Sequence, residues 1–201
     1  MITQTEKKYY TREEYFVLEE TAEYKSEYHD GEIIPMTGGT TNHNKIVGNF
    51  YSKFLITINN QEYEIYMNDV RLSVPDYNLY TYPDVMIIKG KPNYTNKSKT
   101  TVTNPQVIVE VLSKSTQDYD RTEKFKMYRS LLSLNEYIMI NQYRYSVEKY
   151  VKQTEEQWFY SYFDGEEAIL TLSSLEFQIP FNELYSRVEF EESDEIEPEQ
   201  D

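Results

Sequence analysis

The sequence has no cysteine, and it has no apolar segment long enough to cross a membrane. Without cysteine, no disulfide can stabilise the fold and no thiolate can act as a nucleophile. The longest aliphatic stretches, such as Val85-Met-Ile-Ile88, have four or five residues, whereas a membrane-spanning helix needs about 20. The polar N-terminus lacks the apolar core of a secretory signal. Together these absences predict a cytoplasmic protein that does not interact with a membrane.

Glycine and proline are also scarce, with 6 and 7 residues among 201, which excludes collagen-like and low-complexity chains. Hydrophobic residues make up 39% and charged residues 27%, as in an ordinary soluble protein. Two separate cores would be too small in a chain of this length. We therefore expect one domain over residues 1–188, followed by a disordered acidic tail over residues 189–201.

The net charge of −15 argues, taken as a whole, against a protein that coats DNA. The charge is unevenly placed, because residues 189–201 contain eight acids and no base. In contrast, residues 85–130 contain nine bases and four acids. Residues 38–61 contain no acid at all, but they do contain Lys45, Lys53 and His43. Two acid-poor segments within an acidic chain could therefore form one positive surface.

The sequence pattern predicts a mixed α/β or α+β fold, with a central mixed sheet flanked by helices and a C-terminal β-meander. Thr11 and Glu14 form a capping box that opens a helix, and Asp30-Gly31 suits the tight turn of a hairpin over residues 23–36. Further helices are expected over residues 43–58 and 119–132. Strands are expected over 62–67, 70–74, 84–88, 106–112 and 136–141, and the meander over 145–152, 157–163, 167–172 and 176–181.

Two acids stand at or within strongly apolar strands. Asp84 precedes Val85-Met-Ile-Ile88, and Glu110 is central in Val107-Ile-Val-Glu-Val-Leu112. An ionised carboxylate is costly to bury, so each acid must be protonated, paired or bound to a cation. Two such acids in neighbouring strands favour a site for a hard divalent ion. A structural acid, paired or exposed at an edge, is the alternative for either residue alone.

Four motifs follow one another along the chain: Tyr82-Pro-Asp84, Pro105-Gln-Val-Ile-Val-Glu-Val-Leu-Ser113, Ser115-Thr-Gln-Asp-Tyr-Asp-Arg-Thr-Glu-Lys124 with Tyr128, and Asn135-Glu-Tyr-Ile-Met-Ile-Asn141. In this order they resemble the "putative restriction endonuclease" family often written Uma-two, within the PD-(D/E)XK nuclease superfamily. The resemblance extends to Tyr28-His-Asp-Gly-Glu-Ile-Ile34 and His43, and covers about residues 10 to 190.

This resemblance implies a restriction-endonuclease-like fold and metal-dependent hydrolysis of DNA phosphodiesters. By position, Asp84 and Glu110 would bind Mg²⁺, for which Mn²⁺ could substitute. The superfamily places its lysine two residues after the second acid, where this chain has Leu112, and the match in this family is Lys124. Asp120, Lys124 and Tyr128 share one helical stripe, so Lys124 can point at the reacting phosphate or water. The alternative for Lys124 is a surface lysine paired with Asp120.

Two further residues are candidates for the site. The predicted helix over 43–58 has no acid, so Glu32 is the nearest match for the additional N-terminal acid of many such nucleases, or else a surface glutamate. His43 follows a Gly-Gly loop and could approach phosphate or metal-bound water, or simply cap the helix.

Three functions compete at this point. The first is a Mg²⁺-dependent DNA endonuclease, which by family analogy could be a homodimer. The second is a catalytically silent DNA-binding or complex-forming module, which Leu112 and Asn141 leave open because both depart from the family pattern. The third is a sugar hydrolase with two carboxylates and no metal, against which the lysine and the family pattern argue.

Overall fold

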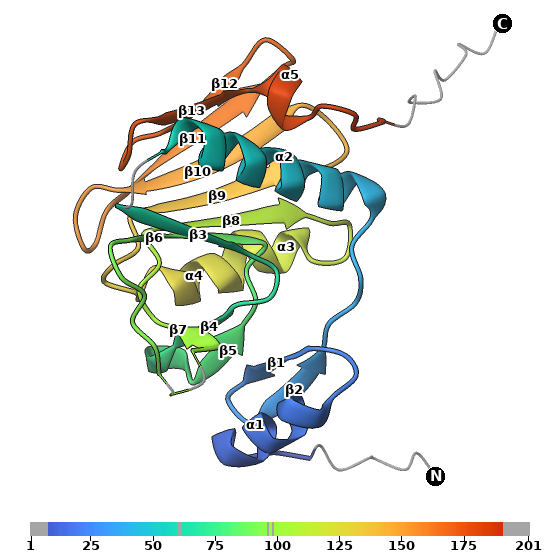
Figure 1. Ribbon diagram of the computed structural model, residues 1–201, viewed down its shortest axis with the longest axis vertical. Helices are drawn as coiled ribbons and strands as arrows, with labels where there is room; N and C mark the ends of the chain where they lie inside the picture. Colours follow the sequence, from blue (N-terminus) through green and yellow to red (C-terminus); the bar gives the residue numbers. More distant parts are fainter. Residues whose placement is uncertain (1–7, 60–61, 96, 98, 191–201) are drawn as a thin grey trace, which may run out of the picture.

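Three β-sheets organise the computed structural model, which describes residues 8–59, 62–95, 97 and 99–190. The largest has six strands in the order β11-β10-β9-β8-β6-β3, and the second has five in the order β2-β1-β5-β4-β7. The third consists of β12 and β13 alone. The predicted class is confirmed, since mixed sheets are flanked by helices (Figure 1).

The six-stranded sheet carries the centre of the molecule. Its strands are β3 (Tyr63–Met67), β6 (Val85–Lys89), β8 (Val107–Leu112), β9 (Glu136–Asn141), β10 (Ser146–Lys152) and β11 (Trp158–Asp164). Neighbours are antiparallel except β8 and β9, which run parallel. A parallel pair needs a crossover connection, and the helical segment over residues 117–128 provides it.

Helices pack on both faces of this sheet (Figure 1). α2 (Thr41–Thr57) lies across one face, where Ile46, Val47, Phe50 and Phe54 are buried against a cluster of sheet residues. The other face packs against the crossover, which consists of α3 (Gln117–Tyr119), a π-helical turn (Asp120–Lys124) and α4 (Phe125–Tyr128). Because side chains alternate along β8, Glu110 shares the crossover face with its apolar neighbours at 108 and 112.

The N-terminal part supplies two of the five strands of the second sheet. It contains α1 (Arg12–Thr21), β1 (Ser26–His29) and β2 (Glu32–Pro35), which join β4 (Arg71–Val74), β5 (Leu79–Thr81) and β7 (Thr101–Val102), with a 3₁₀ turn over Pro75–Tyr77. The predicted capping box is confirmed, since Thr11 and Glu14 exchange both hydrogen bonds. The predicted hairpin turn is also confirmed, because Asp30 and Gly31 both have positive φ, at 44° and 102°.

The C-terminal strands occupy the predicted positions, but the meander is not continuous. β10 and β11 extend the central sheet beyond β9, whereas β12 (Ile169–Leu172) and β13 (Phe177–Pro180) form their own hairpin, followed by α5 (Phe181–Leu184). One face of this hairpin joins the core beneath α2 through Leu170, Leu172, Phe177 and Ile179. β12 and β13 are separate from the central sheet because their hairpin packs on the apolar face of that sheet instead of pairing with its edge strand.

The third predicted helix differs in extent from the 119–132 expected. It begins after Thr116, whose side chain makes no capping hydrogen bond, and ends at Tyr128, where the chain tightens into turns closed by Ser130 and Leu131. Leu132, at the end of the expected helical range, is 77% exposed in these turns.

The predicted acidic tail lies mostly outside the described residues. Its first two residues are described: Glu189 hydrogen-bonds to Asn42, and Phe190 packs on the rings of Tyr145 and Tyr185. The extent of the domain and the disorder of the tail stay predictions. Within the described part of the chain, no helix is both long enough and apolar enough to span a bilayer.

Candidate active site

Asp84 lies immediately before β6, where the central sheet meets the N-terminus of α2. Its Oδ2 accepts a hydrogen bond of 2.7 Å from the backbone N–H of Val111 and lies 3.0 Å from Nε2 of His43. Within the part of the chain that the structure describes, Oδ1 accepts no hydrogen bond. The carboxylate is therefore oriented through one oxygen while the other stays available.

Glu110 lies beside Asp84 because β6 and β8 are neighbours, with Val85 opposite Val109. Its Oε1 accepts hydrogen bonds from Lys124 Nζ at 3.1 Å and from the Tyr128 hydroxyl at 2.9 Å. From the described residues, its Oε2 accepts a single long hydrogen bond, of 3.4 Å, from the backbone N–H of Asp84. The two predicted acids thus come together, and each presents one weakly engaged oxygen.

Lys124 reaches this pair from the π-helical turn. Its Nζ also lies 3.1 Å from Oδ1 of Asp120. The two groups form an ion pair, but their geometry is not that of a hydrogen bond. Asp120, Lys124 and Tyr128 therefore share the stripe that the spacing predicted, and all three are buried or nearly so. Lys126 points elsewhere, with its side chain 53% exposed beside Glu123. π-turns within helices occur frequently at functional sites.

The charges in this cluster are unbalanced toward the negative side. Burial is the main effect that raises the pKa of Glu110, to about 8. The positive charge of Lys124 acts to lower this pKa, but the negative charges of Asp84 and Asp120 oppose it. Burial alone would lower the pKa of Lys124, but the charges of Glu110, Asp120 and Glu27 raise it well above its ordinary value. When Glu110 is ionised, three acids lie around one buried lysine, and a further cation would be favourable here.

His43 lies where the Gly-Gly loop enters α2. Thr40 caps this helix by accepting a hydrogen bond from the His43 backbone N–H, so the side chain of His43 itself does not cap the helix. Burial alone would lower the pKa of His43, but the hydrogen bond and charge of Asp84 raise it overall. A Cβ atom on Gly39 would lie 3.0 Å from His43 Nδ1, so glycine there leaves room for the ring.

A second polar group adjoins the site from strand β1, and the sequence reasoning missed it. Glu27 is buried and hydrogen-bonds to His29 and Thr81, and the Tyr119 hydroxyl lies 3.2 Å from His29. Burial alone would raise the pKa of Glu27, but His29, Lys124 and Thr81 lower it overall. Glu32, the predicted additional acid, lies in the edge strand β2 opposite His29. The alternation of Glu27 and His29 around the buried Tyr28 was the available signal.

The residues present fit a Mg²⁺ site in which the protein supplies few ligands and water supplies the rest. Within the described residues, no group of three or more His, Asp or Glu side chains has the arrangement of a metal site. Mg²⁺, however, is usually held by one or two carboxylates and keeps several waters. Asp84 and Glu110 supply two carboxylates with weakly engaged oxygens in a negatively charged cluster, which matches that requirement.

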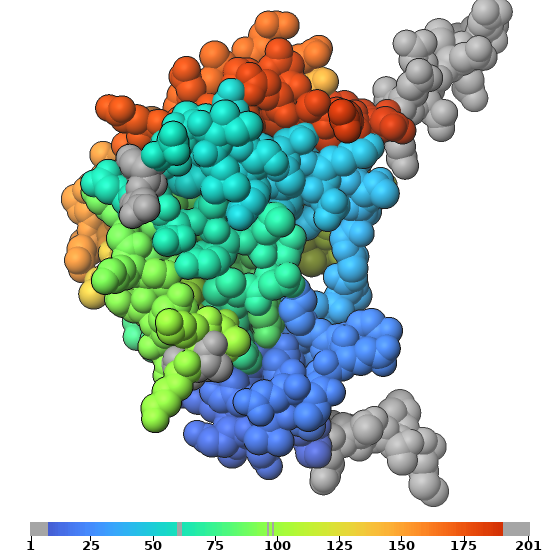
Figure 2. Space-filling view, viewed as in Figure 1, coloured from blue at the N-terminus to red at the C-terminus, as the bar shows by residue number. Residues whose placement is uncertain are grey.

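The surface has a hollow near the N-terminus of α2. Figure 2 shows it between the blue N-terminal segment and the light-blue start of α2, with olive atoms of the crossover region behind. The predicted single positive surface is divided, however. Lys89 lies at the end of β6 remote from Asp84, while Lys45 and Lys53 pair with Glu189 and Glu183. Lys114, which follows β8, remains at the same end of the sheet as the acids.

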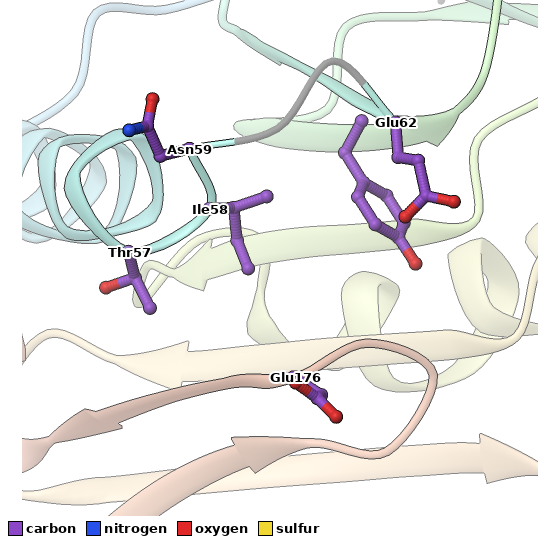
Figure 3. Close-up of a pocket in the computed structure, with 6 residues that line it drawn as sticks. Thr57, Ile58, Asn59, Glu62 and Glu176 are labelled. Carbon is purple, nitrogen blue, oxygen red and sulfur yellow. The ribbon is translucent and has the colours of Figure 1, made fainter.

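Another cavity, of about 340 Å³, lies away from this site (Figure 3). It is lined by Thr57, Ile58, Asn59, Glu62, Tyr63 and Glu176, at the C-terminal end of α2. Tyr63 pairs with Lys89 at the far end of β6, so this cavity and Asp84 lie at opposite ends of the sheet.

Comparison with known proteins agrees with this arrangement. Residues 12–182 match the profile of the Uma2 family, described as "Putative restriction endonuclease". "Uncharacterized protein sll1609" of Synechocystis sp. is 41% identical over 163 residues, covering 81% of this chain and 92% of its own length. "Uncharacterized protein slr1290" of the same organism is 33% identical over 146 residues, covering 73% and 76%.

A crystal structure of "a putative nuclease belonging to DUF820" from Anabaena variabilis is similar in fold. The TM-score is 0.72 at 17% sequence identity, and the match covers 88% of this chain and 98% of the other. At this identity the likeness concerns the fold alone. It agrees with the restriction-endonuclease-like architecture expected from the sequence.

Proposed function

Since the chain belongs to the Uma2 family of restriction-endonuclease-like proteins, we propose that it is a Mg²⁺-dependent endonuclease that hydrolyses DNA phosphodiester bonds. A nuclease-like function follows from the family, whereas the metal, the choice of DNA and the residue roles belong to the proposal. The observation that carries it is a cluster of two strand acids and one buried lysine, in which Glu110 Oε1 lies 3.1 Å from Lys124 Nζ while Glu110 Oε2 lies 3.4 Å from the backbone nitrogen of Asp84.

Asp84 and Glu110 would hold the ion, through the carboxylate oxygens that make no strong hydrogen bond. When bound, Mg²⁺ lowers the pKa of a coordinated water and offsets negative charge on a phosphate. The protein orients both ligands beforehand, because Val111 and His43 hold Asp84 while Lys124 and Tyr128 hold Glu110. Such preorganisation avoids reordering the site during the reaction.

Lys124 would act on the substrate as a fixed positive charge. Its raised pKa keeps the ammonium protonated at neutral pH, so it can donate a hydrogen bond to a phosphate oxygen or to the attacking water. His43 and Glu32 are proposed as additional site residues, and Glu27 joins them because Lys124 and His29 lower its pKa. His43 would steady Asp84, and Mn²⁺ could replace Mg²⁺.

One observation favours a second candidate, a silent DNA-binding or complex-forming module. Lys124 already pairs with Glu110 and Asp120, so the lysine can offset much of the acidic charge without a metal. In such a module the same residues would stabilise the fold, and DNA would bind without being cut. Cytoplasmic location and homodimer formation stay predictions under either function.

Metal-dependent nicking of plasmid DNA tests the proposal, measured for the parent and for Asp84→Asn, Lys124→Ala and Lys126→Ala. We expect Asp84→Asn to lose cleavage and metal-dependent stabilisation together. Lys124→Ala should cut at least about 100-fold more slowly, the usual loss when one electrostatic stabiliser is removed. Lys126→Ala is the matched control, because that side chain is exposed on the same helical segment.

Thermal melts with Mg²⁺ or Mn²⁺ separate binding from turnover. Metal at ten times its dissociation constant should stabilise the parent by about 1.4 kcal/mol, and Lys124→Ala should keep a metal response because ammonium is no ligand. If the parent binds metal and DNA but cuts no form of DNA, the silent module is the better description. Cleavage that is independent of metal would reject the proposed mechanism outright.

A further inference from the structure

Strand β11 forms one edge of the six-stranded sheet, and it is unusual in lacking protection. Among the described strands, it pairs with β10 alone. Edge strands of natural proteins commonly carry lysine, proline or a bulge that prevents pairing with another chain. β11 reads Trp-Phe-Tyr-Ser-Tyr-Phe-Asp over residues 158–164. It has no basic residue or proline, its seven residues pair with β10 without a bulge, and its one charge is at the end.

The backbone groups that face outward can be identified from the ends of the ladder. Gln153 donates to Gln157 and Gly165 donates to Tyr145, which fixes these as hydrogen-bonded pairs. Such pairs alternate along an antiparallel ladder, so Tyr160 and Tyr162 turn their N–H and C=O groups away from β10. Within the described residues, no other backbone or side chain hydrogen-bonds to this outer edge. The edge therefore offers a row of donors and acceptors with which a further extended strand can pair.

The side chains of the same strand are apolar and exposed on both faces. Phe159 is 61% exposed, and Tyr160 and Tyr162 are 45% and 46% exposed. Phe159 lies on one face of the sheet and the two tyrosines on the other, because side chains alternate along a strand. A partner that pairs with the edge would therefore cover large rings on both faces.

The sequence of the strand indicates which partner fits. Residues 159–163 read Phe-Tyr-Ser-Tyr-Phe, which is identical in both directions about Ser161. An antiparallel copy centred there would set Tyr160 opposite Tyr162 and Phe159 opposite Phe163 of the second copy. In this register Tyr160 and Tyr162 are also the residues whose outward N–H and C=O groups meet. No like charges face each other, although the chain as a whole carries −15.

We propose that β11 is a dimerisation strand, which pairs antiparallel with β11 of a second copy around a two-fold axis at Ser161 and joins the two six-stranded sheets. Such an isologous contact closes after two copies and does not propagate into a fibre. The pairing does not depend on the proposed nuclease activity.

The contact should be weak. An aromatic side chain offers about 200 Å², so the exposed parts of the three rings supply roughly 300 Å² per copy. Backbone and flanking side chains bring the total to about 1,000 Å², near the lower limit for specific complexes. We therefore expect a dimer that dissociates on dilution through the micromolar range.

Sedimentation velocity measures this directly, over about 2 to 200 μM, where weak complexes dissociate. The parent should shift from the 24.1 kDa of one chain toward twice that mass. Tyr160→Lys/Tyr162→Lys should stay monomeric, since like charges would then face each other across the axis. The control is Val17→Lys/Ile56→Lys, which alters two exposed apolar residues outside β11 and should dimerise like the parent.

Mixing identifies the partner and the register. A copy with Tyr160→Glu/Tyr162→Glu should remain monomeric alone but form a heterodimer with the lysine copy, because each lysine then faces a glutamate. Circular dichroism and melting would verify that both variants fold. A parent that stays monomeric at the highest concentration, or a lysine variant that dimerises normally, would overturn the proposal. If the parent dimerises but the lysine and glutamate variants form no heterodimer when mixed, the proposed antiparallel register is wrong.

Discussion

Glu110 has a carboxylate in a strand whose other five residues are apolar, and two of the groups around it act against its ionisation. Asp84 and Asp120 add negative charge, while Lys124 provides one positive charge and Tyr128 one hydrogen bond. Removal of water from the carboxylate is the largest effect, and it raises the pKa to about 8. Without metal, the folded protein therefore favours a protonated Glu110 that the unfolded chain would ionise.

This shift predicts how stability depends on pH. A glutamate with a pKa near 4.3 in the unfolded chain and about 8 in the fold binds more protons when folded, so its contribution is complete below 4.3 and is lost as pH rises toward 8. Relative to Glu110→Gln, the metal-free parent should lose a few kcal/mol of unfolding free energy over this range. Urea titrations of both proteins at pH 4.5 and pH 8 measure the difference, since shared groups cancel. A constant difference would contradict the raised pKa.

Gly39 provides a test of how His43 is positioned. Alanine at 39 would press on the His43 ring, whereas a Cβ atom on Gly38 would meet no atom within 4 Å. Gly39→Ala should weaken the contact with Asp84 and lower the raised pKa of His43, and Gly38→Ala should leave this pKa unchanged. NMR titration can follow both, because the chain has only two histidines. Identical His43 titrations in the two variants would mean that Gly39 does not position the ring.

At this scale the sequence could identify acids but not all of their partners. Asp84 and Glu110 stand out because a carboxylate in an apolar strand needs an explanation, and the family resemblance added Lys124. Glu27 lacks such a contrast, since Ser26 and His29 around it are also polar. Its partner Thr81, and Tyr119, which contacts the neighbouring His29, both lie far away in the sequence. Only the folded structure brings these groups together.

Among the elements, the crossover between β8 and β9 has the most direct consequence for the site. Its π-helical turn holds Asp120 and Lys124 on the buried side, whereas Lys126 in α4 is exposed. Lys124→Ala would leave Glu110 and Asp120 without their cation in the interior. Breaking a buried pair in this way costs about 3–5 kcal/mol.

We therefore expect Lys124→Ala to unfold at clearly lower urea concentration than the parent without metal, and Lys126→Ala to stay within about 0.5 kcal/mol of it. Added Mg²⁺ should recover part of the loss in Lys124→Ala, because an ion would replace the missing positive charge. Equal stability of the two variants would show that the positive charge of Lys124 does not stabilise the buried carboxylates of Glu110 and Asp120.

The sequence predicted most elements near their observed bounds because long apolar runs and helical spacing are local signals. It missed β5 and β7, which have three and two residues, too few for any periodicity. It also could not separate β12 and β13 from the central sheet, because strand positions are local whereas strand pairing depends on which face each hairpin covers. The third helix ends at Tyr128, before the expected residue 132, for the same reason: its end depends on tertiary packing and not on a local signal.

At the scale of the whole molecule, the acidic C-terminal segment begins close to the site. Glu189 is held by Asn42, which is adjacent to His43, and its carboxylate lies 3.7 Å from Lys45. Residues 191–201 then contain seven acids. Deleting them should strengthen DNA association several-fold at low salt, because repulsion of phosphate is removed, while the melting temperature hardly changes.

A chain whose acids over 191–201 are replaced by asparagine and glutamine separates charge from length. It should bind DNA like the truncated protein, and all three proteins should converge in high salt because screening removes the difference. Binding by the neutral variant that equals that of the parent would exclude repulsion as the cause. A large fall in melting temperature on truncation would mean that this segment stabilises the fold.

The crossover between β8 and β9 also orders the events of folding. Glu110 lies 14 residues from Lys124 and 18 from Tyr128, whereas Asp84 lies 41 residues from His43 and 27 from Val111. Shorter loops cost less entropy to close, and contacts near in sequence form sooner on average. We therefore expect Glu110 to meet its lysine before Asp84 and His43 arrive. The acid most costly to bury thus acquires its positive partner first, and the paired carboxylates would complete the site late.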